Sequence, residues 1–333
     1  MNRKDERTIV IGSNSFSGSS FVDHLLNQGE DVVGISRSPE PNDVFLKYKW
    51  RLSLNKFQFY QYDVNSNFNE ITQLLEQLKP KKIVNFAAQS MVSQSWDAPE
   101  DWFMTNCVSS VKLQNHLRKS DWIEKYIHVS TPEVYGSTEG PVTEDNGFNP
   151  STPYAVSRAA GDMSIMSFVN SFNFPAVITR AANVYGPGQS LYRIIPRTIL
   201  SILTGETLNL HGGGKSERSF IHIDDVSRAT EEILRQGING ATYHISTNRM
   251  ISIKSLVELI CTMMKVPFED IVQISEDRAG KDQSYELDSK KLRYELNWSD
   301  QVTLENGIDD TLSWVRDNLG VIKSQPREYI HRR

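Results

Sequence analysis

A strand, a glycine-rich turn and a helix in immediate succession at the N-terminus constrain the fold most. Residues 8–11 (TIVI) are expected to form a buried strand, and residues 12–18 read GSNSFSG before an amphipathic helix over residues 19–26. This order is typical of a unit that binds a dinucleotide, whose pyrophosphate lies at the helix N-terminus. Ser15 stands where a middle glycine would let the backbone approach the phosphates, although its hydroxyl can itself bond phosphate. The sequence predicts cofactor contacts from Gly12, Ser15, Phe16 and Gly18.

Strands and helices then alternate along the first half of the chain. Further strands are expected over residues 31–35, 57–62, 82–86, 126–129 and 176–179, with helices over residues 68–78, 100–118 and 153–172. Such alternation produces a parallel sheet with helices on both faces. We therefore expect an α/β fold, with a Rossmann-type doubly wound parallel sheet and a smaller C-terminal α/β substrate-binding domain.

The end of the second strand determines which dinucleotide is expected. NAD-binding units place Asp or Glu about 20 residues after the glycine loop, where it bonds the ribose 2′-OH. This chain has Ser36 and Arg37 there instead. An acid would repel a 2′-phosphate, whereas a hydroxyl and a guanidinium would bind it, so we predict NADP(H) in preference to NAD(H). An Arg in an ordinary strand-end loop is an alternative of nearly equal weight.

A second chemical signal runs from residue 128 to residue 158. An apolar strand ends in Ser130 and Thr131, a polar loop follows, and a helix then carries Tyr154 and Arg158 four residues apart on one face. A nearby cation stabilises phenolate, so this pair can act in acid/base catalysis. Ser130 or Thr131 could hydrogen-bond the same substrate oxygen. Alone, the spacing of Tyr154 and Arg158 is common enough to be an ordinary helix surface.

Composition narrows the classes of partner. With 36 basic and 41 acidic residues the formal charge is −5, which argues against a nucleic-acid binder. No apolar run approaches the length of a membrane span, and the polar N-terminus is not a signal peptide, so we expect a cytoplasmic protein with no membrane partner. Cys107 and Cys261 have neither disulfide nor metal-ligand spacing. The basic residues 327–333 are expected to be a solvated tail.

Basic residues in the second half favour a diphosphate ligand. Arg218 follows a run of three glycines, and Arg278 lies in the segment DRAGKD. A planar guanidinium bonds phosphate through two parallel hydrogen bonds. A loose hairpin is the alternative explanation of the glycine run.

Together these segments resemble the extended short-chain dehydrogenase/reductase family, in its branch of nucleotide-sugar epimerases and 4,6-dehydratases. The matching motifs occur in order over nearly the whole chain: the glycine loop, Asp63-Val64, Ala87-Ala88-Gln89, Ser130-Thr131 with Val134-Tyr135-Gly136, Tyr154 with Arg158, Asn183-Val-Tyr-Gly-Pro, Arg218-Ser-Phe and residues 277–282. The resemblance implies a nucleotide-diphosphate sugar as ligand. It also implies cofactor contacts from Asp63, Val64, Ala87, Ala88, Gln89, Tyr154 and Arg158, and substrate contacts from Ser90, Asn183, Arg218 and Arg278.

Within this branch, the sequence from Ser130 to Glu133 looks like the dehydratases. Residues 277–288 are similar to dTDP-glucose 4,6-dehydratases, whereas the segments around Ser36 and Gln89 are similar to GDP-mannose 4,6-dehydratases, which use NADP. The resemblance implies that Tyr154 takes the proton of the sugar 4-OH and that Glu133 removes the C5 hydrogen, giving a 4-keto-6-deoxy sugar nucleotide. An epimerase would give Glu133 no role.

Three positions depart from the family pattern and leave alternatives open. Arg158 stands where the family has Lys, Pro132 where the dTDP-type dehydratases have an acidic Asp, and Ser15 where the loop has Gly. Pro132 and the missing acid favour a nucleotide-sugar 4-epimerase or reductase. Arg158 favours a nucleotide-sugar-binding protein without turnover. The 4,6-dehydratase remains our prediction.

The resemblance also implies how the chain divides and assembles. We expect residues 1–185 to form the NAD(P)-binding domain, to which residues 219–250 return. Residues 186–218 and 251–333 would form the nucleotide-sugar-binding domain. The helix over residues 153–172 is apolar on more than one face, which suits a homodimer interface as well as a core.

Overall fold

A parallel sheet forms the centre of the structure, a computed structural model that describes residues 7–275 and 286–331. In this part of the chain seven strands pair in the order β11-β7-β5-β4-β1-β2-β3, all parallel. Their bounds are Arg7–Ile11 (β1), Asp31–Ser36 (β2), Phe57–Gln61 (β3), Lys82–Asn85 (β4), Lys125–Val129 (β5), Ala176–Ala181 (β7) and Thr242–Ile245 (β11). The predicted Rossmann-type α/β sheet is confirmed.

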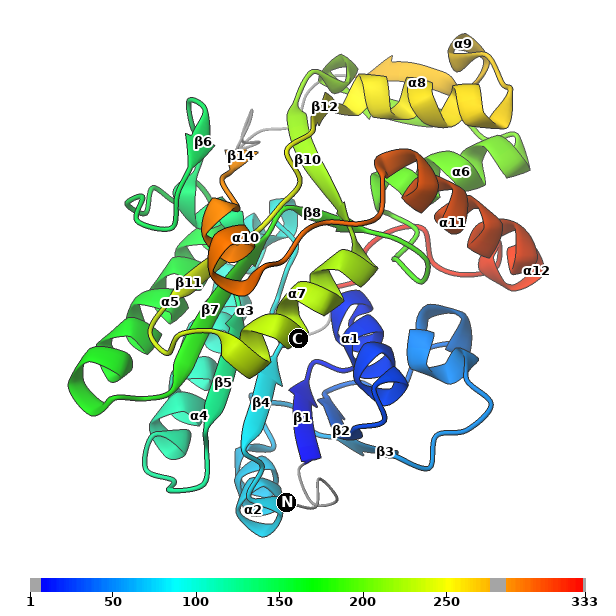
Figure 1. The fold of residues 1–333 in the computed structure, drawn as a ribbon. Helices are drawn as coiled ribbons and strands as arrows, with labels where there is room; N and C mark the ends of the chain where they lie inside the picture. Colours follow the sequence, from blue (N-terminus) through cyan, green and yellow to red (C-terminus); the bar gives the residue numbers. More distant parts are fainter. Residues whose placement is uncertain (1–6, 276–285, 332–333) are drawn as a thin grey trace.

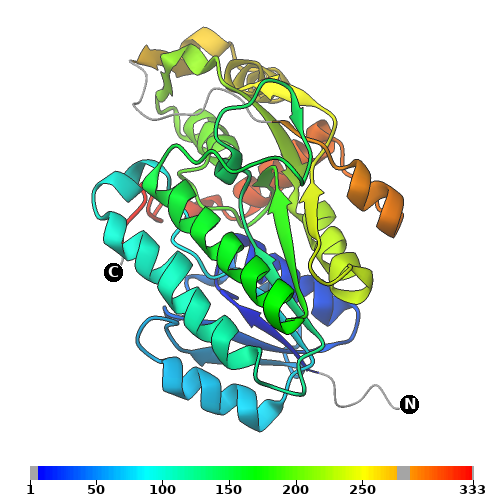
Figure 2. The same ribbon diagram turned by 90° about the vertical axis from the view of Figure 1, so that its left-hand side faces the viewer.

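Helices cover both faces of this sheet (Figures 1 and 2). One face packs against α1 (Phe16–Asn27) and α7 (Ile223–Gln236), and the other against α2 (Phe68–Leu78), α4 (Ser110–Leu117) and α5 (Pro153–Phe172). Alternate strand residues enter the two cores: Val10 packs with α1 and α7, whereas Ile9 and Ile11 pack on the opposite face. Burial on both faces explains the short apolar runs in β1, β2, β4 and β7.

The long helix expected over residues 100–118 is interrupted. The chain instead forms α3 (Pro99–Phe103), a π-helical segment (Met104–Ser109) and then α4. The wider turn packs closely on α5, since a Cβ added at Gly161 would lie 2.8 Å from the Asn106 carbonyl oxygen. It also directs the Asn106 amide to the backbone of Gln89 and to the Ser157 hydroxyl. Such segments are frequent at functional sites.

The second half of the chain builds a smaller α/β part, drawn above the sheet in Figure 1. Here β8 (Asn183–Tyr185), β10 (Glu217–His222) and β12 (Met250–Ser252) form one sheet, and β9 (Leu208–His211) pairs with β13 (Val272–Ser275). The helices are α6 (Ile194–Thr204), α8 (Ile253–Met264), α9 (Phe268–Ile271), α11 (Leu304–Asp317) and α12 (Leu319–Ile322). A short pair joins β6 (Pro141–Val142) to β14 (Glu286–Leu287). The expected smaller α/β part is present.

The chain returns to the large sheet before it ends. Strand β11 adds to β7, and α7 packs beside α1. The later helix α10 (Lys290–Leu296) also joins this core through Leu292, Leu296 and Trp298. The predicted domain boundaries stay predictions, but this part of the region 251–333 packs against the large sheet.

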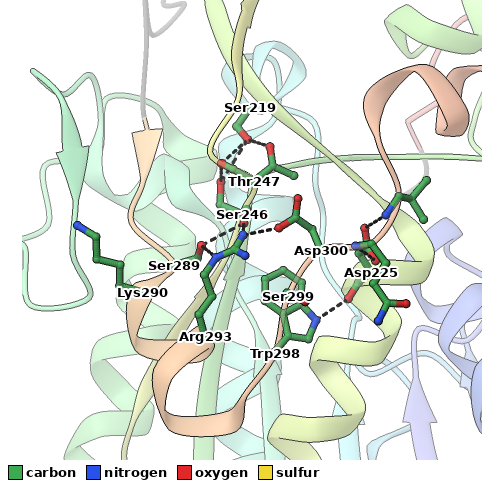
Figure 3. A network of polar contacts seen from close by, with 12 residues as sticks. Ser219, Asp225, Ser246, Thr247, Ser289, Lys290, Arg293, Trp298, Ser299 and Asp300 are labelled. Atoms are coloured by element: carbon green, nitrogen blue, oxygen red, sulfur yellow. Dashed lines mark hydrogen bonds and ion pairs between the residues drawn. The ribbon is translucent and has the colours of Figure 1, made fainter.

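A polar network fixes the crossing between α10 and α11 (Figure 3). The Arg293 guanidinium donates to the Ser246 carbonyl at 2.9 Å and pairs with Asp300. The buried Asp225 carboxylate accepts the backbone N–H groups of residues 301 and 302, both at 3.0 Å. These bonds satisfy backbone groups that would otherwise be buried without acceptors. They hold the small α/β part against the end of β11 and the start of α7.

Among residues 7–275 and 286–331, no helix has the length and apolar character needed to cross a membrane.

Candidate active site

The glycine loop folds as a compact cap on α1. The Ser15 hydroxyl donates to the Gly12 carbonyl at 2.7 Å and accepts the Gly18 N–H at 3.0 Å, so Ser15 is the N-cap of the helix. Gly12 has φ +84°, which favours glycine, and a Cβ on Gly18 would lie 2.2 Å from the Gly12 carbonyl oxygen. Phe16 packs against the α1 side of the core. The loop leaves the helix N-terminus available to a phosphate, with the Ser15 side chain engaged inside the loop.

At the end of β2, Ser36 braces this loop. Its buried hydroxyl accepts the Asn14 N–H at 2.9 Å and lies 3.4 Å from the Ser13 hydroxyl. The neighbouring Arg37 accepts a hydrogen bond from Gln61 through its carbonyl. The Ser36 side chain therefore stabilises the glycine loop through its contacts with Ser13 and Asn14.

The remaining predicted cofactor residues follow the ends of neighbouring strands. Asp63 and Val64 follow β3, and the Asp63 carboxylate accepts the Asn65 N–H at 2.9 Å. Ala87, Ala88 and Gln89 follow β4, where the Asn106 amide holds Gln89 by bonds of 2.8 and 3.0 Å. Because β1, β2, β3 and β4 are adjacent, these segments lie along one edge, at the place where the strand order reverses. Ligands of doubly wound sheets bind in this crevice.

Tyr154 lies beside this edge, near the start of α5. Its side chain is 8% exposed. Burial raises the pKa of the Tyr154 phenol, while the Arg158 charge and a hydrogen bond with Thr131 oppose this rise. The charge of Glu133 also acts on the phenol, in the direction that raises its pKa. The structure thus brings Thr131, Arg158 and Glu133 close enough to act on the Tyr154 phenol, and their catalytic roles stay predictions.

A short helical turn (η6, Pro132–Tyr135) positions Thr131 and Glu133. Thr131 is its N-cap, and the hydroxyl accepts the Glu133 N–H at 3.3 Å. Pro132 occupies the first position of the turn, where its missing N–H leaves no helical bond unmade. The half-buried Glu133 follows, close enough for its charge to act on Tyr154.

Arg158 is anchored to the end of β5 and, in the described part of the chain, keeps one buried nitrogen without a partner. Its Nη2 donates to the Val129 carbonyl at the end of β5, and the side chain is 2% exposed. Within the described residues, its Nε is buried and has no hydrogen-bond partner. A buried N–H of this kind is costly unless a ligand accepts from it. The orphaned Nε and the tight glycine loop fit a dinucleotide along this edge.

Ser130 takes a different direction from Thr131. Its hydroxyl donates to the Asp162 carboxylate at 2.7 Å. Asp162 is fully buried on α5 and also accepts Arg180 Nη2 at 2.8 Å. Of the two hydroxyls expected near the substrate oxygen, Thr131 is the one that bonds Tyr154, and the contact of Ser130 with substrate stays a prediction.

Sequence reasoning missed Asp162 and Arg180. Arg180 continues the network by donating to the Tyr135 hydroxyl, which lies 2.8 Å from His244 Nε2. Burial lowers the pKa of His244 from 6.5 to about 3, so this histidine is neutral at physiological pH. A usable signal was present, because Asp162 lies four residues after Arg158 on the same helix face.

Two of the predicted substrate residues, Asn183 and Arg218, lie on strands of the small sheet. Asn183 on β8 lies in parallel register with Phe220 on β10, the strand that carries the buried Arg218. Arg218 Nη1 donates to the Glu217 carbonyl at 2.7 Å. Ser90 is exposed, after Gln89. Arg278 lies outside the described residues, and the substrate contacts stay predictions.

Comparison with known proteins assigns the family. Residues 9–311 match the family model described as GDP-mannose 4,6 dehydratase. The chain belongs to this family. The expected membership in the nucleotide-sugar branch of extended short-chain dehydrogenases/reductases is confirmed.

Individual relatives agree with this assignment. The chain is 27% identical to dTDP-glucose 4,6-dehydratase of Escherichia coli, over 94% of each chain. The dTDP-glucose 4,6-dehydratase DesIV of Streptomyces venezuelae, solved with NAD bound, has a TM-score of 0.88 and 29% identity, covering 94% of this chain and 98% of that one. The Bacillus anthracis enzyme with NAD has a TM-score of 0.87 and 27% identity, covering 96% and 99%. The predicted enzyme class, a nucleotide-sugar 4,6-dehydratase, is confirmed.

The prediction of NADP(H) over NAD(H) is wrong. Both related dehydratase structures contain NAD. The physical reason lies at the end of β2, where the Ser36 hydroxyl is buried against Ser13 and Asn14 and is used to hold the glycine loop. It is therefore not directed toward a 2′-phosphate. The lack of an Asp or Glu at the end of β2 was therefore not enough to predict NADP(H).

The close packing of Gly18 predicts that one added methyl group there weakens both the fold and cofactor binding. In Gly18→Ala the new Cβ would press on the Gly12 carbonyl, which belongs to the backbone and cannot rotate away. We expect a loss of about 2 kcal/mol in the free energy of unfolding and weaker NADH binding. Urea unfolding and a fluorescence titration with NADH measure the two quantities. Gly147→Ala is the matched control, since no atom lies within 4 Å of its added Cβ. Unchanged NADH affinity in Gly18→Ala would contradict the assignment of the loop.

Proposed function

We propose that this enzyme converts a nucleoside-diphosphate hexose to its 4-keto-6-deoxy product with NAD held at the sheet edge. The observation that carries the proposal is the cluster of Tyr154, Thr131, Arg158 and Glu133 beside that edge. It combines a phenol, a hydroxyl, a fixed cation and a carboxylate. Oxidation at C4 and elimination across C5 and C6 require this set of groups.

Tyr154 serves as the base for the sugar 4-OH. The Arg158 charge and the Thr131 hydrogen bond favour the phenolate against the opposing effect of burial. Arg158 Nε, buried without a partner in the described part of the chain, is available to the cofactor ribose. NAD, when bound, would supply the acceptor and donor for the hydride that moves from C4 to C6 of the sugar within one turnover.

Glu133 serves as both base and acid for the loss of water. A ketone at C4 acidifies the C5 hydrogen, which Glu133 removes as a proton. Pro132 has no proton to donate, so the protonated Glu133 passes this proton to the departing 6-OH, which leaves as water. The proton that Tyr154 took from the 4-OH then goes to C5. One hexose therefore yields one keto sugar and one water.

The sheet edge supplies the cofactor contacts. We assign the pyrophosphate to Gly12, Ser15 and Gly18, and the adenosine side to Arg37, Asp63 and Val64. Phe16, Ser36, Ala87, Ala88 and Gln89 shape the remaining wall. NAD in the related DesIV and Bacillus anthracis structures supports the choice of dinucleotide.

The names of the relatives suggest where to look for the substrate. DesIV and the Escherichia coli enzyme are named dTDP-glucose 4,6-dehydratases. Arg218 on β10 and Asn183 on β8, together with Ser90 and Arg278, are proposed to bind the nucleotide-diphosphate sugar. We therefore propose dTDP-glucose as the first substrate to test.

Product analysis tests the reaction directly. Incubation of the purified enzyme and NAD with dTDP-, UDP-, GDP- and CDP-hexoses should give, for one of them, a product lighter by one water in mass spectrometry. Glu133→Gln removes the base without changing the shape of the side chain, so kcat should fall by about 10²- to 10⁴-fold. An isomer of unchanged mass would support a 4-epimerase instead. No product from any hexose, with NAD bound, would support a binding protein.

The pH profile tests the role of Arg158. Without its charge the pKa of Tyr154 rises further, so less phenolate is present at neutral pH. In Arg158→Gln the pH of half-maximal kcat should therefore move upward by about one unit, since a nearby opposite charge shifts a pKa by this order. Arg158→Lys keeps the charge and should retain a profile near that of the wild type. An unchanged profile in Arg158→Gln would contradict this role.

We also propose that the enzyme is a homodimer. Large apolar side chains are exposed along α3, the π-helical segment and α5, which lie side by side in Figure 2: Phe103, Met104, Val108, Val156 and Met163. Met163 is 60% exposed on a helix whose opposite face enters the core through Ile165. Such a face is stabilised by a second copy of itself.

A charge on this face should separate the subunits. Met163→Glu places a carboxylate in the proposed contact and should shift the molar mass, measured by light scattering after gel filtration, from two chains to one. Tyr294→Glu on α10, where Tyr294 is 91% exposed, is the control and should stay dimeric. A wild-type mass of one chain would overturn the proposal.

A cytoplasmic location stays a prediction. Cys107 and Cys261 are free thiols, and burial raises the pKa of both. Free, unreactive thiols are compatible with a reducing compartment.

A further inference from the structure

The C-terminal segment after α12 crosses from the small α/β part to the large sheet. Its last described residue, His331, contacts Asp101 at 2.7 Å through Nε2. The His331 ring also stacks on the buried Trp102, with ring centroids 4.8 Å apart and planes 15° apart. Figure 2 shows this red segment ending beside the cyan helices that include α3. The tail is therefore docked on the protein at its far end.

The near end of the segment is held by the small α/β part. Arg327 pairs with Glu206, which follows α6. Glu328 pairs with Arg197 on α6 at 3.4 Å. Both pairs are partly exposed, so each contributes little by itself. Together with the His331 contacts, they fix the two ends of residues 327–331 on different parts of the molecule.

Tyr329 lies between these anchors and faces the cofactor edge. Its hydroxyl donates to Gln89 Oε1 at 3.3 Å, and its ring meets Tyr192 edge-on with centroids 5.9 Å apart. Burial raises the pKa of Tyr329, and the charge of Arg37 opposes that rise. Tyr329 is thus close to Gln89 after β4 and within the field of Arg37 after β2.

The positions of Gln89 and Arg37 indicate which part of the molecule Tyr329 covers. Strands β2 and β4 lie on either side of β1, whose glycine loop is the expected pyrophosphate site. Tyr329 bonds Gln89 on one side of that loop and is influenced by the charge of Arg37 on the other side, which places its side chain in front of the loop. A dinucleotide bound along the edge would lie beneath it.

We propose that residues 327–331 form a strap that closes the cofactor site, with Tyr329 in contact with the bound dinucleotide. The strap must lift from Gln89 and Asp101 before the dinucleotide exchanges. This inference rests on the proposed function for the identity of the ligand. A strap of this kind suits a cofactor that is regenerated in each turnover, because the enzyme does not have to exchange it between turnovers.

The rate of cofactor release tests the strap without using turnover. NADH is bound to the enzyme, excess NAD is added, and the loss of NADH fluorescence gives the dissociation rate constant. Truncation after Gln325 and the single substitution Tyr329→Ala should each raise this constant by about tenfold or more, because affinity changes of this kind fall mainly on dissociation. Ile330→Ala is the matched control, since Ile330 is 60% exposed on the same segment, and should dissociate like the wild type.

The outcomes separate the two proposals. NADH binding with an unchanged dissociation rate in Tyr329→Ala overturns the strap and leaves the proposed function intact. No NADH binding by the wild type overturns the proposed cofactor and the strap together. Circular dichroism of each variant confirms that the fold is retained, and Tyr329→Ala decides the matter if the truncated chain does not fold.

Discussion

The buried ion pair between Asp162 and Arg180 is the interaction on which the active site depends. It joins the helix that carries Tyr154 and Arg158 to strand β7, and it also orients Ser130 at the end of β5. Burying two charges is expensive, and a pair of this kind is retained only with good geometry and further hydrogen bonds. Here the Tyr135 hydroxyl accepts from Arg180 and lies 2.8 Å from the neutral His244, which extends the network. The acid/base helix is thereby fixed at one angle to the sheet.

The turn over residues 132–135, which presents Glu133 to the site, is made rigid in another way. Pro132 takes the first position of a short turn, and Thr131 caps it while bonding Tyr154. The proline that removes a general acid from this position therefore also restricts the backbone that presents Glu133. Arg158 is likewise restricted, because its Nη2 bonds the Val129 carbonyl. These departures from the family pattern fit together as one arrangement of the site.

Much of this structure could be predicted from the sequence because its strongest signals are local. The central parallel strands, buried on both faces, carry short apolar runs, and the helices over residues 68–78 and 153–172 begin and end where their patterns do. The cofactor preference failed because it depended on where the Ser36 hydroxyl points, and tertiary contacts with Ser13 and Asn14 decide that. The π-helical segment was missed for a similar reason, since its cause is close packing against Gly161. The tail was expected to be solvated, yet Tyr329 and His331, two residues apart, both contact the large domain.

The central claim is that one site oxidises C4 and reduces C6 of the same sugar, with Tyr154 and Glu133 moving the protons. The most direct test places deuterium at C4 of the nucleotide hexose that the enzyme turns over and locates the label in the product by NMR. The account predicts that the deuterium is found in the C6 methyl group, on a sugar that is now a 4-ketone. Deuterium retained at C4 with inverted or unchanged configuration, or lost to solvent, would contradict it.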